Sequence, residues 1–361
     1  PPPPPPPPPP RLDSSAASDV YKRQHRWCLP GGVAAHRREL PLPDHPSPPD
    51  RLARFAIQGG PFTDADALAA HAREVEALGY DELYTADHVG RPDGGPEDSP
   101  PSVDPFAPLL VAAGATSRLR VGPLVINNEL HHPVLLARTA ATIDRLTGGR
   151  LVLGMGTGYQ QSEHDAIGSP IRPPGPRVDR FAESLAILRS LFDSGSAGHA
   201  GEHLDVHLDD LGVRPVQDRL PVLIGGHGRR VVGVAGRFAD IYQFTGLTHA
   251  ADGTVAPGGF GMDDLRRRAA WLSDAAAGRR IERSALVQFT AVADRAPSPD
   301  DLADRFGLAA DTLAESPFVL TGPVEQIVDQ LERTREELGI SHIVVRDPDG
   351  FAPVVDRLRG R

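Results

Sequence analysis

The sequence predicts an α/β fold, a (β/α)8 TIM barrel in which eight parallel strands alternate with helices. Eight apolar, strand-like segments alternate with helical segments over about 310 residues, which is the count and the length of such a barrel. No segment repeats at a fixed period of about 20–50 residues, so a solenoid is not indicated. The rival fold, a doubly wound open sheet, usually opens with GxGxxG after its first strand, whereas this chain has Gln-Gly-Gly-Pro-Phe at residues 58–62.

The elements of the first half follow from caps and apolar spacing. Residues 54–58 (RFAIQ) read as a short buried strand, and Asp64 is a good N-cap for a helix that ends at Gly79. Apolar residues at strand or helix spacing predict the elements that follow. These are strands at 81–85, 119–126 and 151–155, one helix that ends near Arg118, and two helices at 134–146 and 178–192.

The second half continues the alternation. Strands are expected at 221–224, 240–244, 285–292 and 341–345, and helices at 228–238, 263–277, 324–338 and 353–358. Long polar loops at 90–105 and 160–176 are insertions after the second and fourth strands. Such loops vary freely between relatives, and these two together with residues 193–219 would decide the substrate. A polar excursion at 193–219 is expected to hold a short hairpin.

Residues 1–50 are predicted to be disordered or artefactual, outside a barrel domain of residues 51–361. The first ten residues are all proline, which forms a rod without a core, and five more prolines between 41 and 49 prevent a helix. A ligand for an aromatic-grooved domain is the functional alternative. We favour an artefact, because DVYKRQ at 19–24 resembles a translated transposase-adapter read and a cytosine homopolymer encodes polyproline.

Charge and cysteine usage exclude several classes of partner. Outside residues 1–50 the chain holds 32 Lys/Arg and 43 Asp/Glu, a net charge of −11. Such a surface repels nucleic acid and anionic lipid, and no stretch approaches the ~20 apolar residues of a membrane helix. The one cysteine, Cys28, lies in the doubtful segment, so neither disulfides nor thiolate-bound metals are expected. No secretory leader is recognisable, and we expect a cytoplasmic protein.

The active site of a barrel lies where its strands end, at the C-terminal face. Most of the unusual residues in the chain lie at the ends of the predicted strands, namely Gln58, Asp87, His88 and residues 125–129, 156–159 and 225–228. No metal-binding spacing occurs among them, since Glu163-His164 and Glu202-His203 do not form a helical histidine pair.

His88 is the candidate acid or base, because it follows the second strand directly and histidine exchanges a proton near neutral pH. Asp87 is the second candidate catalytic residue, because its carboxylate can raise the basicity of His88. Because successive strand residues point to opposite faces, Asp87 can instead bind backbone. The plain alternative for His88 is a solvated or hydrogen-bonded side chain.

Two glycine-rich segments follow strands. Gly154, Gly156 and Gly158 leave bare backbone for a flat or phosphorylated ligand, with Thr157 as a hydroxyl donor. In PVLIGGHGRR (221–230) a strand runs through glycines into a helix, whose first N–H groups and dipole favour a phosphate. Arg229 or Arg230 adds positive charge there. A tight strand-to-helix turn is the alternative for the second segment.

The motifs ADHV (86–89), HPVLLA (132–137) and LTGGRLVLG (146–154), with the glycine loop after them, resemble the luciferase-like monooxygenase superfamily. Within it they resemble the branch that uses the deazaflavin coenzyme F420. The resemblance covers roughly residues 54–359 and implies a TIM barrel. It also implies that His88 is catalytic, since ADHV is similar to the pattern that carries the catalytic histidine in many deazaflavin enzymes.

Residues 119–133 (LRVGPLVINNELHHP) resemble the third strand of that superfamily, where relatives hold a non-proline cis peptide bond behind the flavin ring. The resemblance implies a cis bond at Leu124-Val125, or else at Val125-Ile126, with an ordinary strand end as the alternative. The expected cofactor-binding residues are Gln58, Leu124, Val125, Asn127, Gly156, Thr157, Gly158 and Tyr159, and for the phosphate Gly225, Gly226, His227, Gly228 and Arg229. Tyr159 replaces a glutamate of some relatives, which argues against a sugar-phosphate substrate.

The resemblance thus implies an oxidoreductase that transfers a hydride between coenzyme F420 and a small organic substrate, while His88 moves the matching proton. The alternative is an FMN-dependent monooxygenase, which uses oxygen and reduced flavin from a partner reductase. A second alternative is a cofactor-binding protein without turnover. A homodimer is compatible with each of them. Neither nucleic acid nor membrane is an expected partner.

Overall fold

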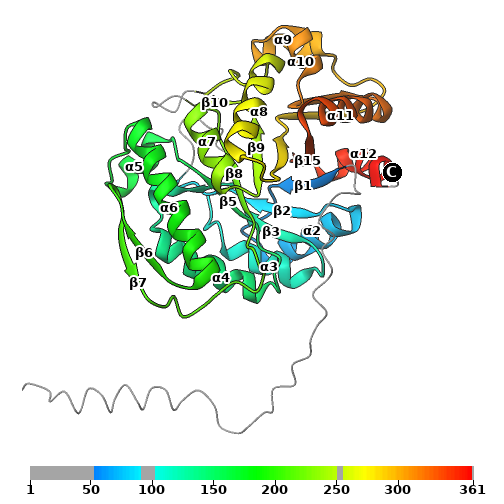
Figure 1. Ribbon diagram of the computed structural model, residues 1–361. Helices are drawn as coiled ribbons and strands as arrows, with labels where there is room; N and C mark the ends of the chain where they lie inside the picture. The colour runs from blue at the N-terminus through cyan, green and yellow to red at the C-terminus, as the bar shows by residue number, and fades with distance from the viewer. Residues whose placement is uncertain (1–52, 91–101, 250–254, 360–361) are drawn as a thin grey trace, which may run out of the picture. The chain divides into compact units, whose positions relative to one another are not determined.

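Parallel strands form the centre of the molecule, and helices surround them (Figure 1). The computed structural model describes residues 53–90, 102–249 and 255–359. Our expectation for residues 1–50, like most of the loop after the second strand, lies outside these residues. Within them, no helix is both long enough and apolar enough to span a membrane.

Nine strand segments join side by side into a nearly closed ring. Neighbouring strands pair in parallel in the order β3 (Arg120–Pro123), β2 (Glu82–Thr85), β1 (Arg54–Gln58), β15 (Ile340–Val345), β12 (Glu282–Leu286), β9 (Ile241–Thr245), β8 (Val222–Gly225), β5 (Leu153–Gly156) and β4 (Ile126–Asn127). β3 and β4 are two parts of the one strand predicted at 119–126. Ile126 pairs with Met155 and Val121 bridges to Leu151, so this strand links both ends of the sheet. The predicted barrel is confirmed.

The third strand is interrupted at Leu124-Val125, where the peptide bond is cis, as the resemblance implied. The carbonyl oxygen of Leu124 accepts a hydrogen bond of 2.8 Å from Nε2 of Gln58, at the end of β1. The first strand thus holds the backbone of the interrupted one, which makes Gln58 part of the barrel mouth.

Eight helices form most of the outer layer: α2 (Ala65–Leu78), α3 (Ala107–Ala115), α4 (Pro133–Leu146), α6 (Pro174–Ser194), α7 (Arg229–Phe238), α8 (Met262–Ala276), α11 (Val324–Leu338) and α12 (Pro348–Arg359). The predicted caps of α2 are confirmed. Asp64 accepts a hydrogen bond from the N–H of Ala67, and Gly79 ends the helix with φ 96°.

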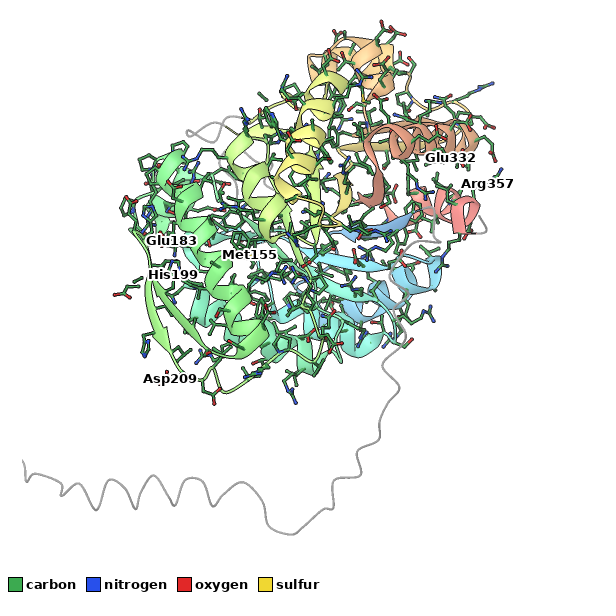
Figure 2. All side chains as sticks on the ribbon, viewed as in Figure 1. Met155, Glu183, His199, Asp209, Glu332 and Arg357 are labelled. Carbon is green, nitrogen blue, oxygen red and sulfur yellow. The ribbon has the colours of Figure 1, made fainter. Side chains whose placement is uncertain are left out.

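Alternation along each strand divides the apolar residues between two cores. In β1, Phe55 and Ile57 belong to the large core between strands and helices, whereas Ala56 belongs to a small core within the ring. Met155 of β5, labelled in Figure 2, also belongs to the large core and is fully buried.

Several elements differ from the prediction. The strand expected at 285–292 divides into β12 and β13 (Phe289–Val292), because the backbone N–H of Gln288 turns away to the carbonyl of Phe318. β13 pairs with β14 (Val319–Gly322), which was not predicted. The predicted hairpin is present as β6 (Ala197–Ala200) and β7 (Asp205–Leu208). Other elements absent from the prediction are α5 (Gln161–Ile167), α9 (Pro299–Phe306), α10 (Ala310–Glu315), β10 (Thr248–His249) and β11 (Val255–Ala256).

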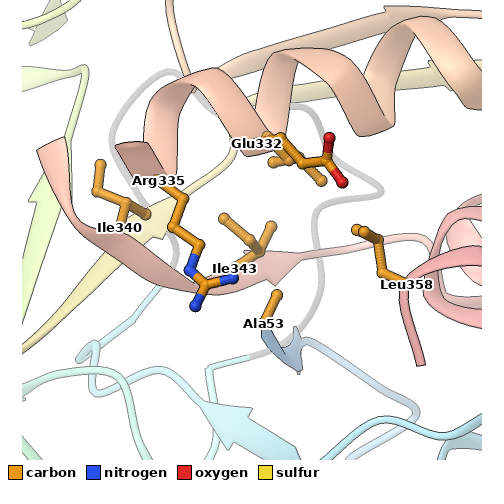
Figure 3. A pocket seen from close by; sticks show the side chains of 7 residues that line it. Ala53, Glu332, Arg335, Ile340, Ile343 and Leu358 are labelled. Atoms are coloured by element: carbon orange, nitrogen blue, oxygen red, sulfur yellow. The ribbon is translucent and has the colours of Figure 1, made fainter. Parts of the chain in front are cut away.

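Charged side chains fill the N-terminal end of the barrel. Glu82 is completely buried, and its carboxylate lies 2.7 Å from Nη1 of Arg54 and 2.7 Å from Nε2 of His342. Burial alone would raise the pKa of Glu82, but Arg54, His342 and Arg120 hold that pKa well below its ordinary value. A shallow pocket nearby, between α11, β15 and α12, is lined by Ala53, Leu331, Glu332, Arg335, Ile340, Ile343 and Leu358 (Figure 3). It holds none of the predicted site residues.

Candidate active site

His88 and Glu163 form a hydrogen-bonded pair at the C-terminal end of the barrel. Nδ1 of His88 lies 2.6 Å from Oε1 of Glu163, which also accepts from the backbone N–H of Val89 at 3.3 Å. Glu163 lies on the short helix α5 that follows the glycine loop after β5. It is 2% exposed, whereas the side chain of His88 is 33% exposed. A buried carboxylate therefore holds an imidazole that solvent can reach.

The pair has a defined proton chemistry. When Nδ1–H donates to the carboxylate, Nε2 is the nitrogen that can exchange a proton with a substrate. The hydrogen bond to Glu163 raises the pKa of His88; burial opposes this, and the charges of Glu163 and Asp87 add to it. A histidine held in this way retains its proton to a higher pH than an exposed one and can act as a general acid.

Asp87 contacts backbone and a second histidine. Its Oδ2 accepts from the backbone N–H of Asn127 at 2.9 Å and lies 2.9 Å from Nε2 of His131. Asp87 thus binds backbone, which was the alternative interpretation of this residue, and its catalytic role stays a prediction. Its charge still contributes to the raised pKa of His88, but the carboxylate in contact with that imidazole is that of Glu163.

Asn127 links the two carboxylates. Its backbone N–H binds Asp87, its Nδ2 lies 3.4 Å from Oε2 of Glu163, and its Oδ1 accepts from the N–H of Glu129 at 3.0 Å. Gly158 packs directly against this side chain, with φ 74°, and a Cβ there would lie 2.0 Å from Oδ1 of Asn127. Position 158 therefore requires glycine, because a side chain there would collide with Asn127.

The other glycines of the loop after β5 also have neighbours within the chain. A Cβ on Gly156 would lie 2.8 Å from Cγ2 of Val125, and one on Gly154 would lie 2.2 Å from the carbonyl oxygen of Pro123. Thr157, which stands between Gly156 and Gly158 in the sequence, is half-buried. Tyr159 presents its ring to that of His88 edge-on at 6.3 Å, and burial together with Glu163 raises the pKa of Tyr159.

The glycine loop after β8 leads into the start of α7. Gly228 is the N-cap of α7 and gives no side-chain cap, and no acidic residue occupies the first turn. A Cβ on Gly225 would have 3.9 Å to its nearest neighbour, whereas Gly226 has φ 154° and a Cβ there would lie 2.5 Å from Val231. The side chain of Arg229 is exposed at this helix start. Backbone N–H groups at such a start favour an anion.

The side chain of His227 is held from behind the loop. Nδ1 lies 3.1 Å from Nη1 of Arg268, which is fully buried, and Nε2 lies 2.7 Å from the carbonyl oxygen of Leu247. Because a guanidinium only donates, Nδ1 accepts and Nε2 carries the proton. The imidazole of His227 thus fixes the loop as a neutral group.

Sequence reasoning missed Glu163, His131 and Arg268. The sequence presents Glu163 only as a metal-ligand candidate beside His164, although a carboxylate one turn after a glycine loop at a strand end is itself a signal. His131 and Arg268 gave no such signal. In the part of the chain that the structure describes, no three His, Cys, Asp or Glu side chains are grouped so as to hold a metal ion.

The sequence profile of the luciferase-like monooxygenase family matches residues 50–296. The chain is 30% identical over 251 residues to an uncharacterized protein of Mycobacterium tuberculosis, across 65% of this chain and 81% of that protein. It is 27% identical over 295 residues to the F420-dependent glucose-6-phosphate dehydrogenase of Kineococcus radiotolerans, across 80% of this chain and 82% of that enzyme.

Solved structures share the fold. An F420-dependent secondary alcohol dehydrogenase superposes with a TM-score of 0.67 at 18% identity, across 85% of this chain and 99% of that one. A long-chain alkane monooxygenase superposes with a TM-score of 0.68 at 16% identity, across 86% and 92%. The barrel, the interrupted third strand and the family match agree, and the chain is an enzyme of the luciferase-like monooxygenase family.

Proposed function

We propose that this enzyme is an F420-dependent oxidoreductase, which transfers a hydride between the deazaflavin and a small organic substrate while His88 moves the matching proton. The observation that carries the proposal is the His88–Glu163 pair at the mouth of the barrel. Hydride transfer to or from a carbonyl or alcohol needs one proton at the substrate oxygen, and a single positioned histidine supplies it. The curated relative from Kineococcus radiotolerans is named for the same coenzyme.

The chain offers suitable groups for this coenzyme. The ring would lie against Leu124, Val125 and Asn127, next to the loop Gly156–Tyr159. The phosphate would lie at the start of α7, where the helix has no side-chain cap, a Cβ on Gly228 would meet open space and one on Gly225 would have its nearest neighbour at 3.9 Å. The bound coenzyme would supply the carbon that gives or takes the hydride, and the protein supplies orientation and proton transfer.

In this proposal Glu163 is a positioning residue. Its carboxylate accepts from Nδ1–H of His88 and so presents Nε2 for proton exchange. Asn127 holds Glu163 in turn, and Tyr159 covers one edge of the imidazole. Tyr159 in place of a glutamate argues against a sugar-phosphate substrate, and an alcohol or carbonyl compound without a phosphate is the class we propose.

The FMN-dependent monooxygenase is the second candidate function, because the fold is shared with a long-chain alkane monooxygenase. In that case reduced flavin would come from a partner reductase. A homodimer and a cytoplasmic location are further proposals that stem from the sequence.

A coenzyme assay tests the proposal. Purified protein with oxidised F420 is offered a panel of small alcohols, and with reduced F420 a panel of carbonyl compounds, and the absorbance of the oxidised ring is followed. We expect turnover with at least one compound, lost in His88→Ala. Turnover that needs FMN, a reductase and oxygen, with none on F420, would contradict the proposal.

A further inference from the structure

Two arginines pair with one buried carboxylate beside the candidate active site, and a third arginine lies one helical turn away. Nη1 of Arg172 lies 2.8 Å from Oε2 of Glu129, and Nη1 of Arg180 lies 3.3 Å from Oε1. Arg177 lies one turn of α6 before Arg180, and burial lowers its pKa although the charge of Glu129 opposes this. Because Glu129 donates its backbone N–H to Asn127, this group adjoins the His88–Glu163 pair.

Two buried side-chain nitrogens here, one of Arg177 and one of Asn128, have no hydrogen-bond partner in the described part of the chain. Nε of Arg177 is buried and makes no hydrogen bond there. Asn128, whose carbonyl oxygen accepts from Arg180, is 1% exposed, and its Nδ2 also makes none. Buried donors without acceptors are uncommon in proteins and call for an explanation. Arg172 is 42% exposed in its side chain, so a ligand from outside can reach the group.

The group continues to the proposed phosphate loop. A Cβ on Gly175, in the first turn of α6, would lie 3.3 Å from Nη1 of Arg230, which is the second residue of α7 and pairs with Asp179. α6 begins after Pro173 without a side-chain cap and without an acidic residue in its first turn. Two helix starts therefore stand next to each other at the barrel mouth, and the dipoles of both favour negative charge.

We call these residues the arginine rim: Arg172, Arg177, Arg180, Arg229 and Arg230. Two carboxylates, those of Glu129 and Asp179, form the ion pairs of this group with its arginines. The whole chain has a formal net charge of −10, so this local positive excess has the opposite sign. It matches an anionic ligand with more than one negative group.

We infer that the arginine rim is a second anion subsite, which binds carboxylates carried by the tail of the cofactor beyond its phosphate. The inference rests on the proposed function, because coenzyme F420 continues past its phosphodiester into a chain of glutamates, whereas FMN ends at its phosphate. Arg172 and Arg177 are the residues expected to meet these carboxylates. Guanidinium binds carboxylate with two parallel hydrogen bonds, which suits a row of such groups.

A double substitution, Arg172→Met with Arg177→Met, tests the inference on the whole protein. Glu129 keeps Arg180 as its partner in this variant. Arg145→Met with Arg357→Met is the matched control, since it removes the same charge from the last turns of α4 and α12. Figure 2 labels Arg357. Dissociation constants are measured by fluorescence for F420, for FMN and for the dephosphorylated deazaflavin ring analogue.

We expect the double variant to bind F420 about tenfold more weakly, because it loses two partly exposed charge-assisted contacts. Its dissociation constants for FMN and for the ring analogue should stay within about threefold of the wild-type values. The control should change none of them. Unchanged F420 affinity, or equal losses for all three ligands, overturns the inference and leaves the proposed function intact. Failure of the wild type to bind F420 contradicts the proposed function and the inference together.

Discussion

Replacing Glu163 by Gln should lower the pKa of His88. The substitution keeps the length and volume of the side chain, and its amide oxygen can still accept from His88 Nδ1–H and from the N–H of Val89, but the negative charge is lost. The hydrogen bond to Glu163 is the largest cause of the raised pKa of His88, ahead of the opposing effect of burial. With that charge removed, burial should favour the neutral imidazole.

The energetic effect follows from the same contact. A hydrogen bond to a charged group contributes roughly 1.5–3 kcal/mol to stability and a neutral one about 0.5–1.5 kcal/mol. Since solvent screens the half-buried His88, we expect a loss near the low end, about 1 kcal/mol. A raised pKa stabilises the fold fully below the unfolded value of about 6.5. The difference between wild type and variant should thus be largest near pH 5–6 and shrink as the pH rises through the pKa of folded His88.

Imidazole NMR over a pH series measures the titration of His88 without any substrate, and thermal unfolding at the same pH values measures stability. Asp165→Asn is the matched control, since Asp165 lies on the same helix and contacts Gln161 instead of His88. A His88 titration in Glu163→Gln that coincides with that of the wild type would refute the role given to Glu163.

Four further predictions concern the site, the buried carboxylate Glu82 and the N-terminal segment. His88→Ala should lower turnover by roughly 10²-fold or more and change coenzyme affinity only a few-fold; collapse of affinity with intact single-turnover chemistry would make His88 a binding residue. Gly225→Ala, which meets no close neighbour, should weaken phosphorylated cofactors far more than the dephosphorylated ring analogue, and equal losses would place the phosphate elsewhere. Glu82→Gln should lower the free energy of unfolding by about 3–5 kcal/mol at pH 7. This difference from the wild type should shrink below about pH 4.3, where glutamate in the unfolded chain binds its proton, and acid unfolding curves of both proteins measure it. Deleting residues 1–50 should leave the melting temperature and cofactor affinity unchanged, and a fall of more than a few degrees would contradict this.

The structure changes how the loop after β8 should be tested. A valine at Gly226 at first looks suitable to block a phosphate. However, Gly226 has φ 154° and a Cβ there would lie 2.5 Å from Val231, so the substitution would disturb the fold itself. Gly225 is free of this conflict, and for that reason it is the residue to change.

The eight barrel strands and their order of appearance could be predicted because each of these strands carries its own signal. Short apolar segments between glycines and helix caps such as Asp64 and Gly79 are local patterns, and the barrel then places all strand ends at one face. The cis bond at Leu124-Val125 could be predicted only through the family resemblance. The boundary between β12 and β13 could not, since apolar residues continue across it and the break depends on the distant Phe318.

The partners within the site could not be predicted from the sequence. Glu163 lies 75 residues from His88, and their contact requires α5 to fold over the end of β2. Arg268 reaches His227 from a helix 41 residues away, and its burial is not visible in a sequence where arginine normally marks the surface. Contacts of this kind depend on tertiary packing, which spacing along the chain does not encode.

The choice of coenzyme is the central claim, and a paired titration tests it most directly. Purified wild-type protein is titrated with F420 and, separately, with FMN, and binding is followed by fluorescence quenching. FMN can use the start of α7 but carries no carboxylates for Arg172 and Arg177, so we expect F420 to bind at least about tenfold more tightly. FMN binding that equals or exceeds that of F420 would contradict the account and favour the monooxygenase.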